Sequence, residues 1–297
     1  MLAKRLAIGL SMVALLMAVM ALDDRLAPYY PLWLVAALVV MGASSLELVD
    51  LLGRAGAKAS GNTVFGGVMA IALANWAPHV ASTTTAAAPM MPAYDPLAPV
   101  HALAWPLLAF AATLMGAFIA RAVQYDRKGD ASTAIAGSIL AVAYIGILGS
   151  FALQLRWLGV VPLASMVAAA KGSDIGAYTF GRLFGRRKLW PRLSPNKTVE
   201  GALGGLVGGV AFTLLITALA RLGFGLKTLS VPHSIGFGLV VGASAQLGDL
   251  MESMLKRDGD RKDASASVPG FGGVLDVVDS LLFAAPVAFV YWLAVGG

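Results

Sequence analysis

The sequence predicts an all-α fold, a polytopic transmembrane helical bundle of about nine spans. Three observations carry this prediction, two from composition and one from the pattern of apolar residues. Of the 297 residues, 58% are hydrophobic and only 13% are charged, and the mean hydropathy is +0.78. Because soluble domains average about 25% charged residues, this deficit along the whole chain indicates a protein embedded in lipid.

The third observation is a series of apolar runs close to the roughly 20 residues that cross about 30 Å of hydrocarbon. Nine candidate spans lie at about residues 5–22, 31–53, 63–81, 102–123, 132–154, 157–180, 200–222, 234–255 and 274–295. The third is the weakest because it is short and contains Asn75. The Pro-, Ala- and Thr-rich stretch 81–100 that follows has no Lys or Arg and is predicted to be a loop.

The first apolar run allows two interpretations. Lys4 and Arg5, followed by an apolar segment containing 18-AVMA-21, are also typical of a cleaved signal peptide. We favour a retained helix because the run continues to Leu22, beyond the roughly 7–15 residues of a signal sequence's apolar region. Cleavage would leave the sidedness of all later spans unchanged.

The distribution of Lys and Arg predicts the orientation of the spans. These residues concentrate in alternate connections, including the long ones at 182–205 and 256–273. The opposite connections hold Arg25, Arg156, Arg221 and Lys227. Because positive residues favour cytoplasmic loops, we expect an N-in/C-out topology in the cell membrane (the inner or plasma membrane), with both long connections facing the cytoplasm.

The basic balance of the chain does not indicate nucleic-acid binding, although the net charge is +6 and the pI is near 9.7. In a chain this apolar, basic residues act as topology signals and lipid-headgroup contacts. The absence of Cys excludes disulfides, zinc–thiolate sites and thiol catalysis. His79, His101 and His233 lie far apart without metal-ligand spacing, so no His-based metal site is expected.

Polarity divides the chain into two parts. Residues 1–155 are expected to form the N-terminal transmembrane helices, spans 1–5, as a region that faces lipid or a dimer partner. Residues 156–297 supply spans 6–9 with their cytoplasmic loops and hold nearly all of the unusual polarity. Ionisable groups within spans cost about 2.5–3.5 kcal/mol each to insert, so each one is a functional hypothesis.

Polar residues recur at helical spacing in two of these later spans, so each set shares one helical face. In the sixth span the set is Lys171, Asp174, Tyr178 and Arg182. In the eighth span the set is Gln246, Asp249, Ser253 and Lys256, flanked by Glu252 and Arg257. An ion pair that only neutralises itself remains an alternative for Lys171 and Asp174. A snorkelling helix end explains the basic residues of the eighth span but not the deeper Asp249, so we interpret that set as functional.

Two further carboxylates, Asp276 and Asp279, begin the last span at i, i+3 spacing. Either one alone suits a helix N-terminus, but two carboxylates opposite the Asp249 helix suit a hard divalent cation such as Mg²⁺. The connections 182–205 and 256–273 are rich in Lys, Arg, Ser and Gly, which favour phosphate. Such loops alone are typical of orientation signals. Beside carboxylates they predict a site for a nucleoside triphosphate.

The stretch 249–280 resembles the phosphatidate cytidylyltransferase (CDP-diacylglycerol synthase) family, whose signature reads S-x-x-K-R, four residues, K-D, a P-G-H-G-G turn and D-R-x-D. The residues in register are Ser253, Lys256, Arg257, Lys262, Asp263, Pro269, Gly270, Gly272, Gly273, Asp276 and Asp279. The upstream segments 174-DIGAYTFGRLFG-185, 194-SPNKTVEGALGG-205 and 246-QLGDL-250 also match. The resemblance covers about residues 171–285.

This resemblance implies transfer of the CMP part of CTP to phosphatidate, giving CDP-diacylglycerol and pyrophosphate for phospholipid biosynthesis, with one or two Mg²⁺ ions. It also implies a membrane homodimer with a polar cavity open to the cytoplasm and to lipid. The implied metal ligands are Asp249, Asp276 and Asp279, and the implied catalytic residues are these three with Lys256. The implied substrate contacts are Asp174, Tyr178, Ser194, Lys197, Thr198, Ser253, Arg257, Lys262 and Asp263.

The chemistry of such a site agrees with the residues present. In-line attack of one phosphate on another depends on positioning and charge neutralisation, and an ionised lipid phosphate needs no strong general base. The chain departs from the signature at Phe271, where the family has His, and at Val277, where it has Arg. These departures leave the lipid acceptor open. A CTP-dependent polyprenol or phytol kinase remains an alternative, as does a transporter or lipid-binding scaffold.

Overall fold

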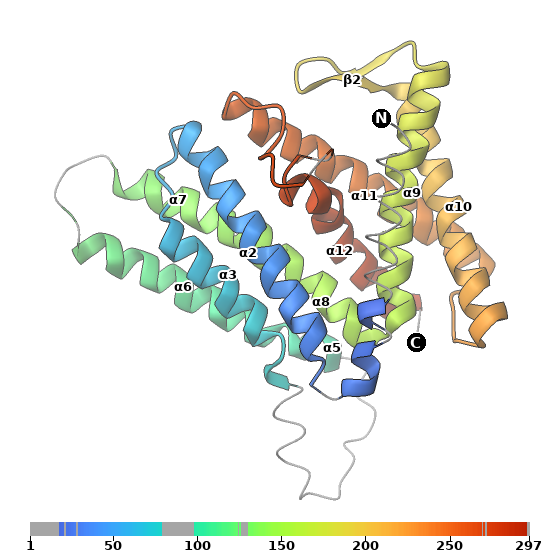
Figure 1. Cartoon of the computed structure of the whole chain (residues 1–297), viewed down its shortest axis with the longest axis horizontal. Coiled ribbons are helices and arrows are strands. Elements are labelled where there is room, and N and C mark those ends of the chain that lie inside the picture. The colour runs from blue at the N-terminus through green and yellow to red at the C-terminus, as the bar shows by residue number, and fades with distance from the viewer. Residues whose placement is uncertain are drawn as a thin grey trace, which may run out of the picture. The chain divides into compact units, whose positions relative to one another are not determined.

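The computed structural model describes residues 18–20, 22–27, 29–78, 98–123, 125, 130–268, 270 and 272–295. Within them the secondary-structure elements are all helices except one two-stranded antiparallel hairpin (Figure 1). The predicted all-α class is therefore confirmed at this level. The first predicted span, 5–22, and the predicted loop 81–100 lie almost entirely outside the described residues, as does His79.

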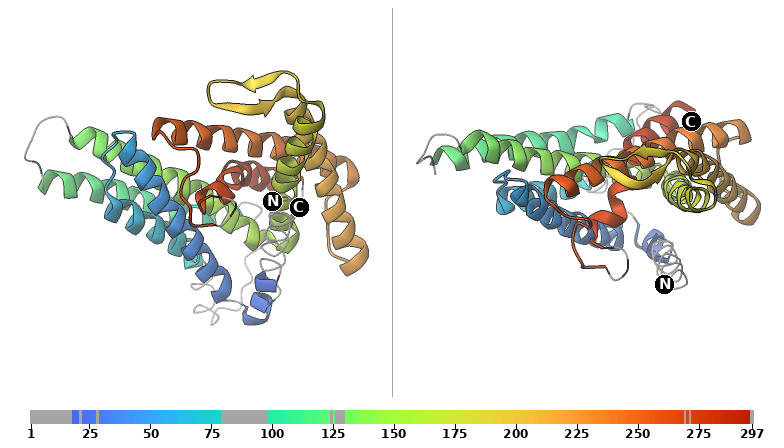
Figure 2. Two further views of the ribbon diagram at one scale, coloured as in Figure 1. Left: turned by 45° about the horizontal axis from the view of Figure 1, so that its top comes forward. Right: turned by 90° about the horizontal axis from the view of Figure 1, so that it is seen from above.

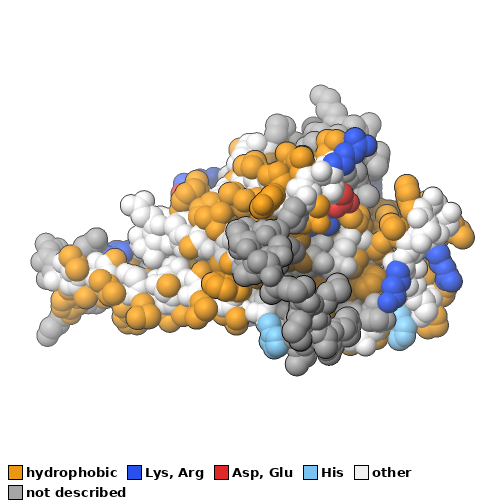
Figure 3. Space-filling view, turned by 90° about the horizontal axis from the view of Figure 1, so that it is seen from below, with side chains coloured by type: hydrophobic (Ala, Val, Ile, Leu, Met, Phe, Trp, Pro, Cys, Tyr) orange, Lys and Arg blue, Asp and Glu red, His pale blue; other side chains and the backbone are white. Residues whose placement is uncertain are grey.

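Six helices among the described residues are long and apolar enough to cross a membrane. They are Pro31–Arg54, Val100–Val123, Ala131–Leu158, Val199–Phe224, Val231–Asp258 and Leu275–Val295. Large hydrophobic side chains remain exposed on them, including Leu108, Met115 and Ile119 on the second helix. Hydrophobic side chains also predominate over charged ones on the face shown in Figure 3. These surfaces suit contact with lipid tails, and the chain is a membrane protein; nine spans and N-in/C-out orientation stay predictions.

Contacts divide the chain into two compact units. Unit 1 comprises Met1–Ser150 with Asp263–Leu275, and unit 2 comprises Phe151–Lys262 with Asp276–Gly297. The helices of unit 1 are η1 (Asp24–Leu26), α2 (Pro31–Arg54), α3 (Gly61–Ala74), α5 (Ala98–Ala102), α6 (Ala104–Val123), α7 (Ala131–Ala141) and the π-helical η2 (Val142–Ile147). The division of roles between residues 1–155 and 156–297 stays a prediction.

Helix starts in unit 1 are fixed by side chains outside the helices. Buried Asp23 accepts hydrogen bonds from the backbone N–H groups of Leu32 (2.9 Å) and Trp33 (3.0 Å) at the beginning of α2. Ser60 caps α3 by accepting a bond from the N–H of Thr63. Such caps satisfy backbone donors that have no partner within the first helical turn. The third predicted span is therefore a short helix, since α3 ends at Ala74, one residue before Asn75.

Unit 2 receives the end of α8 (Leu148–Leu158), which continues the apolar span of α7 and η2. Its other elements are α9 (Val160–Phe184), β1 (Lys188–Trp190), β2 (Ser194–Thr198), α10 (Val199–Phe224), α11 (Val231–Asp258) and α12 (Leu275–Val295). α9 and α10 lie side by side in every view (Figures 1 and 2). Their backbones touch at a glycine seam formed by Gly172, Gly176, Gly204 and Gly208, where an added Cβ would strike the opposing backbone or side chains. Small residues permit this close packing in membranes.

A hairpin joins α9 to α10 within the long connection 182–205, for which the sequence predicts no strands. β1 pairs with β2 in antiparallel register, with Lys188 opposite Thr198 and Trp190 opposite Ser194. Glu200 closes the base of the hairpin by accepting a bond of 3.0 Å from the N–H of Arg186. Thr198 then caps α10 through the N–H of Gly201 (3.1 Å). The hairpin therefore has a fixed attachment at the start of α10.

Candidate active site

The centre of the candidate site is a cluster of three carboxylates on α11 and α12. One carboxylate oxygen from each of Asp249, Glu252 and Asp279 lies within 4.8 Å of the other two. Asp249 and Glu252 are one helical turn apart on α11, and Asp279 lies near the start of α12. The two helices are joined directly, because Ser244 Oγ donates a bond of 2.7 Å to the carbonyl oxygen of Phe283.

These carboxylates are withdrawn from solvent to different extents. Glu252 has no exposed surface and Asp279 is only 5% exposed, whereas the side chain of Asp249 is 37% exposed. Burying an ionised carboxylate is costly unless a cation or hydrogen-bond donors compensate it. The cluster therefore has a closed inner end and one carboxylate that faces outward, which suits a site that substrate approaches from one side.

Lys256 supplies a positive charge at the inner end. Its Nζ forms an ion pair with Glu252 and another with Oδ1 of Asp276 at 2.6 Å, and Lys256 is itself buried. Asp276 consequently points to Lys256 and is not one of the three clustered carboxylates. The sequence analysis named Asp276 as a metal ligand and left Glu252 out. Glu252 stands in the cluster with Asp249 and Asp279, and the predicted metal role of Asp276 stays a prediction.

A second lysine, Lys171 on α9, links that helix to α12. Its Nζ donates to Oδ2 of Asp174 (3.1 Å), to the carbonyl oxygen of Val277 (2.9 Å) and to Ser280 Oγ (3.0 Å). The Lys171–Asp174 ion pair considered from the sequence is thus present. It does more than neutralise itself, because the same ammonium group also holds the first turns of α12 beside α9.

A third lysine comes from the hairpin. Lys197 on β2 forms an ion pair of 2.8 Å with Oδ2 of Asp249, and its side chain is 25% exposed. Behind this contact, Gln246 Nε2 on α11 donates to Ser173 Oγ (3.0 Å) on α9 and to the carbonyl oxygen of Ala202 (3.1 Å) on α10. The hairpin, α9, α10 and α11 are therefore joined around the outward-facing carboxylate.

The remaining predicted site residues differ in how far they are exposed to solvent. Ser253 and Thr198 are buried, Ser194 is half-buried on β2, and Lys262 and Asp263 are exposed after the end of α11. Tyr178 is exposed on α9, where its hydroxyl accepts a bond of 3.3 Å from Arg182. Arg257 is exposed and donates to the carbonyl oxygen of Arg261 (3.0 Å). Phe271 and Pro269 lie outside the described residues.

The cluster has the donor chemistry of a divalent-cation site. Mg²⁺ takes oxygen ligands and is usually held by one or two carboxylates together with substrate phosphates. Oε1 of Glu252 is buried and has no hydrogen-bond partner among the described residues. A buried carboxylate oxygen left in this way fits a cation ligand, so Asp249, Glu252 and Asp279 could hold a metal.

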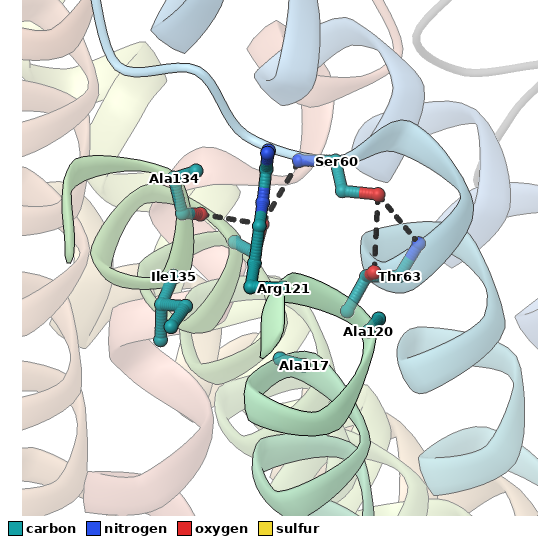
Figure 4. Close-up of a pocket in the computed structure, with 8 residues that line it drawn as sticks. Ser60, Thr63, Ala117, Ala120, Arg121, Ala134 and Ile135 are labelled. Atoms are coloured by element: carbon teal, nitrogen blue, oxygen red, sulfur yellow. Dashed lines mark hydrogen bonds between the residues drawn. The ribbon is translucent and has the colours of Figure 1, made fainter. Parts of the chain in front are cut away.

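A separate small cavity of about 30 Å³ lies in unit 1, between α3, α6 and α7 (Figure 4). Arg121 lines it, and the N–H of Ser60 donates a bond of 2.9 Å to Ser138 Oγ at its wall. The cavity is large enough for only one or two water molecules. It contains none of the predicted site residues, so it is not a candidate for the substrate site.

Comparison with known proteins identifies the family. The profile of the family described as "Cytidylyltransferase family" matches residues 3–295. The chain is 40% identical to the phosphatidate cytidylyltransferase of Staphylococcus aureus (strain COL) over 149 residues, which are 50% of this chain and 55% of that protein. It is 39% identical to the phosphatidate cytidylyltransferase of Bacillus subtilis (strain 168) over 157 residues, 52% of this chain and 56% of that protein. The chain spans about half the length of these curated relatives. It belongs to the cytidylyltransferase family.

Proposed function

We propose that the chain transfers the cytidylyl group of CTP to phosphatidate, giving CDP-diacylglycerol and pyrophosphate. The observation that carries this proposal is the cluster of Asp249, Glu252 and Asp279, with Lys197 and Lys256 beside it. Carboxylates can bind the metal and ammonium groups can neutralise the phosphate oxygens, so together they suit a metal-bound phosphate. The family, and relatives that are phosphatidate cytidylyltransferases, supply the reaction.

The reaction is a displacement at the α-phosphorus of CTP. An oxygen of the lipid phosphate forms a bond to that phosphorus, and the bond to the bridging oxygen of the pyrophosphate breaks in line with it. Both reactants are anions, so neutralising and positioning their charges are the main tasks of the protein. Bound Mg²⁺ would supply Lewis-acid stabilisation of the phosphate oxygens.

The residues of the chain divide these tasks according to their burial. Lys256 is buried and holds Glu252 and Asp276, so we assign it to orienting the carboxylates. The Lys197 ammonium group lies beside Asp249, with its nitrogen buried and its side chain 25% exposed, so we assign it to neutralising a phosphate oxygen held at Asp249. Asp249 would hold the metal where CTP arrives, and Asp279 would hold it from α12. The roles predicted for Ser194, Thr198, Arg257 and Lys262 as phosphate contacts belong to the same proposal.

We also propose the membrane arrangement expected from the sequence. The spans run N-in/C-out, so the hairpin and the loop after α11 face the cytoplasm, where CTP is found. A homodimer is the assembly that the family resemblance favours. The exposed apolar side chains of α6 would face lipid or the second copy.

The decisive experiment follows the two ends of CTP separately. Purified protein in detergent is given phosphatidate, Mg²⁺ and CTP labelled either at the α-phosphate or at the γ-phosphate. We expect the α-label in the lipid fraction and the γ-label in released pyrophosphate. A γ-label in lipid, with CDP released, would instead identify a CTP-dependent lipid kinase. No CDP-lipid with phosphatidate, but product with another lipid phosphate, would reassign the acceptor.

Asp249→Asn tests the cluster within the same assay. Removing the charge of a group that stabilises the transition state typically costs about 100- to 1,000-fold in rate, and we expect a loss of this order. Asp130→Asn is the matched control, because Asp130 also pairs with a lysine, Lys58, at 2.7 Å on unit 1. Wild-type turnover by the Asp249→Asn protein would remove the carboxylate cluster from the proposal.

A further inference from the structure

The loop between α11 and α12 is anchored by a residue more than two hundred positions earlier in the chain. Glu47 lies on α2, and its Oε1 accepts hydrogen bonds from Ser265 Oγ (2.7 Å) and Ser267 Oγ (2.6 Å). All three residues belong to unit 1. One carboxylate oxygen thus accepts hydrogen bonds from two hydroxyl groups of the loop.

The same carboxylate also binds the backbone at the start of α12. Oε1 accepts a bond from the N–H of Val274 (3.1 Å), and Oε2 accepts one from the N–H of Leu275 (2.8 Å), the first residue of α12. The first N–H groups of a helix have no partner within the helix. They normally receive one from a nearby Ser, Thr, Asp or Asn. Gly273 and Val274, which precede α12, have no side chain that can do so, and Glu47 takes that place.

The backbone conformation of the loop allows its N–H groups to reach the Glu47 carboxylate. Val268 and Gly272 exchange two backbone hydrogen bonds, of 2.7 and 3.1 Å, across a tight turn. Gly270 and Gly272 have φ angles of +85° and +99°, a conformation that other residues rarely adopt. At Gly273 an added Cβ would collide with the carboxylate of Glu47. The close approach therefore requires glycine at this position.

We propose that Glu47 is a positioning residue for the transferase reaction, so this inference rests on the function proposed above. By capping α12 it fixes the start and rotation of that helix. The next residue, Asp276, pairs with Lys256, and Asp279 follows one turn later in the carboxylate cluster. A negative charge at a helix N-terminus is also favourable in itself. Glu47 touches no reacting atom, and it acts by setting where these two carboxylates point.

The test compares Glu47→Ala and Glu47→Gln with Asp50→Asn. Asp50 lies on the same helix, carries the same charge and forms an exposed ion pair with Arg54 at 2.9 Å, so it controls for loss of charge on α2. For each variant, kcat and the KM for CTP are measured with phosphatidate. Hydrogen exchange of the amides in 264–280 is followed in the same detergent. Size-exclusion chromatography confirms that each variant is folded.

We expect kcat to fall about 10- to 100-fold in Glu47→Ala, the range seen when the partners that orient metal ligands are removed, with a smaller change in KM. Glu47→Gln keeps one acceptor oxygen and should lose less. The amides of Val274 and Leu275 should exchange faster in both, and Asp50→Asn should match wild type in every measurement. Gly273→Ala disturbs the same contact through the loop, because its added Cβ would collide with the Glu47 carboxylate. This variant should reproduce the loss of kcat and the faster exchange.

Two results would overturn the inference. One is Glu47→Ala with wild-type kcat and unchanged exchange at Val274 and Leu275, and the other is an equal loss in Asp50→Asn. An inactive wild-type protein would count against the proposed function instead. In that case faster exchange at α12 in Glu47→Ala would still establish the cap, while unchanged exchange would remove it.

Discussion

Unit 1 and unit 2 both bury polar side chains in helices, but they do so in different ways. In unit 1 the acidic side chain of Asp23 is buried as the cap of α2, and most of the other buried polar side chains are neutral. Asn75 donates to the carbonyl oxygen of Ile71 (2.8 Å) and to Ser150 Oγ (3.0 Å), and Ser138 donates to its own helix at Ala134 (2.7 Å). Such bonds let a polar residue remain in an apolar setting at little net cost.

Unit 2 differs in burying a group of charged side chains, which form ion pairs within α11 and between α11 and α12. Glu252, Lys256 and Asp279 are all nearly or fully buried, and Lys171 joins α9 to α12. Breaking such a pair is far more costly than removing a neutral hydrogen bond, because a buried charge is left without compensation. The comparison leads to the hypothesis that the polarity of unit 1 supports the fold, whereas the charged cluster of unit 2 serves the proposed site. Three predictions test this difference.

The largest effect is expected for Lys256→Met in unit 2. This change leaves Glu252 and Asp276 without the ammonium group that they share. Removing one partner of a buried ion pair costs about 3–5 kcal/mol, so thermal unfolding in detergent should shift strongly downward and turnover should be lost. Adding Glu252→Gln should restore part of the stability but none of the activity. If the double variant is as unstable as Lys256→Met alone, the charges are not the source of the loss.

An intermediate effect is expected for Asn75→Ala in unit 1. The variant leaves the hydroxyl of Ser150 and the carbonyl of Ile71 without the side-chain amide, which costs about 1–3 kcal/mol for buried groups. Thermal unfolding should register that loss, while kcat for CDP-lipid formation should stay at the wild-type value. A fall in kcat at full stability would contradict the separation of roles between the units.

The smallest effect is expected for Lys58→Ala, which removes the exposed ion pair with Asp130. The two side chains are 63% and 56% exposed, and exposed pairs contribute only about 0–1 kcal/mol. The matched change in unit 2 is Lys197→Ala, where the lysine pairs with Asp249 at a similar distance of 2.8 Å. Turnover should fall in Lys197→Ala alone, and equal turnover in both variants would remove Lys197 from the site.

The sequence predicts the helices well where apolar length decides them. The predicted span 31–53 is α2 at Pro31–Arg54, and the predicted span 274–295 is α12 at Leu275–Val295. The β1–β2 hairpin escaped prediction because its strands are short and polar, with no alternation of apolar residues. The π-helical turns at Val142–Ile147 were also missed, because one extra residue per turn leaves no mark in an apolar run.

For the candidate site, the sequence named most of the residues but not which of their side chains lie close together. Helical spacing placed Asp249 and Lys256 on one face of α11, and the structure agrees. Which carboxylates of α11 and α12 meet depends on how each helix is rotated, and composition does not encode that rotation. Glu252 could have been noticed from its i, i+3 spacing to Asp249. Glu47 could not, because 228 residues separate it from Leu275.

The glycine seam between α9 and α10 bears on how this protein can be redesigned. The two helices are in direct contact at Gly176 and Gly204, and glycine is already the smallest residue. Any larger residue at these positions would push the helices apart. A library that tests other acceptors for the proposed reaction should hold these glycines constant. Diversity is better placed on the exposed positions of the hairpin and of α9, such as Trp190 and Tyr178, where a new side chain displaces no backbone.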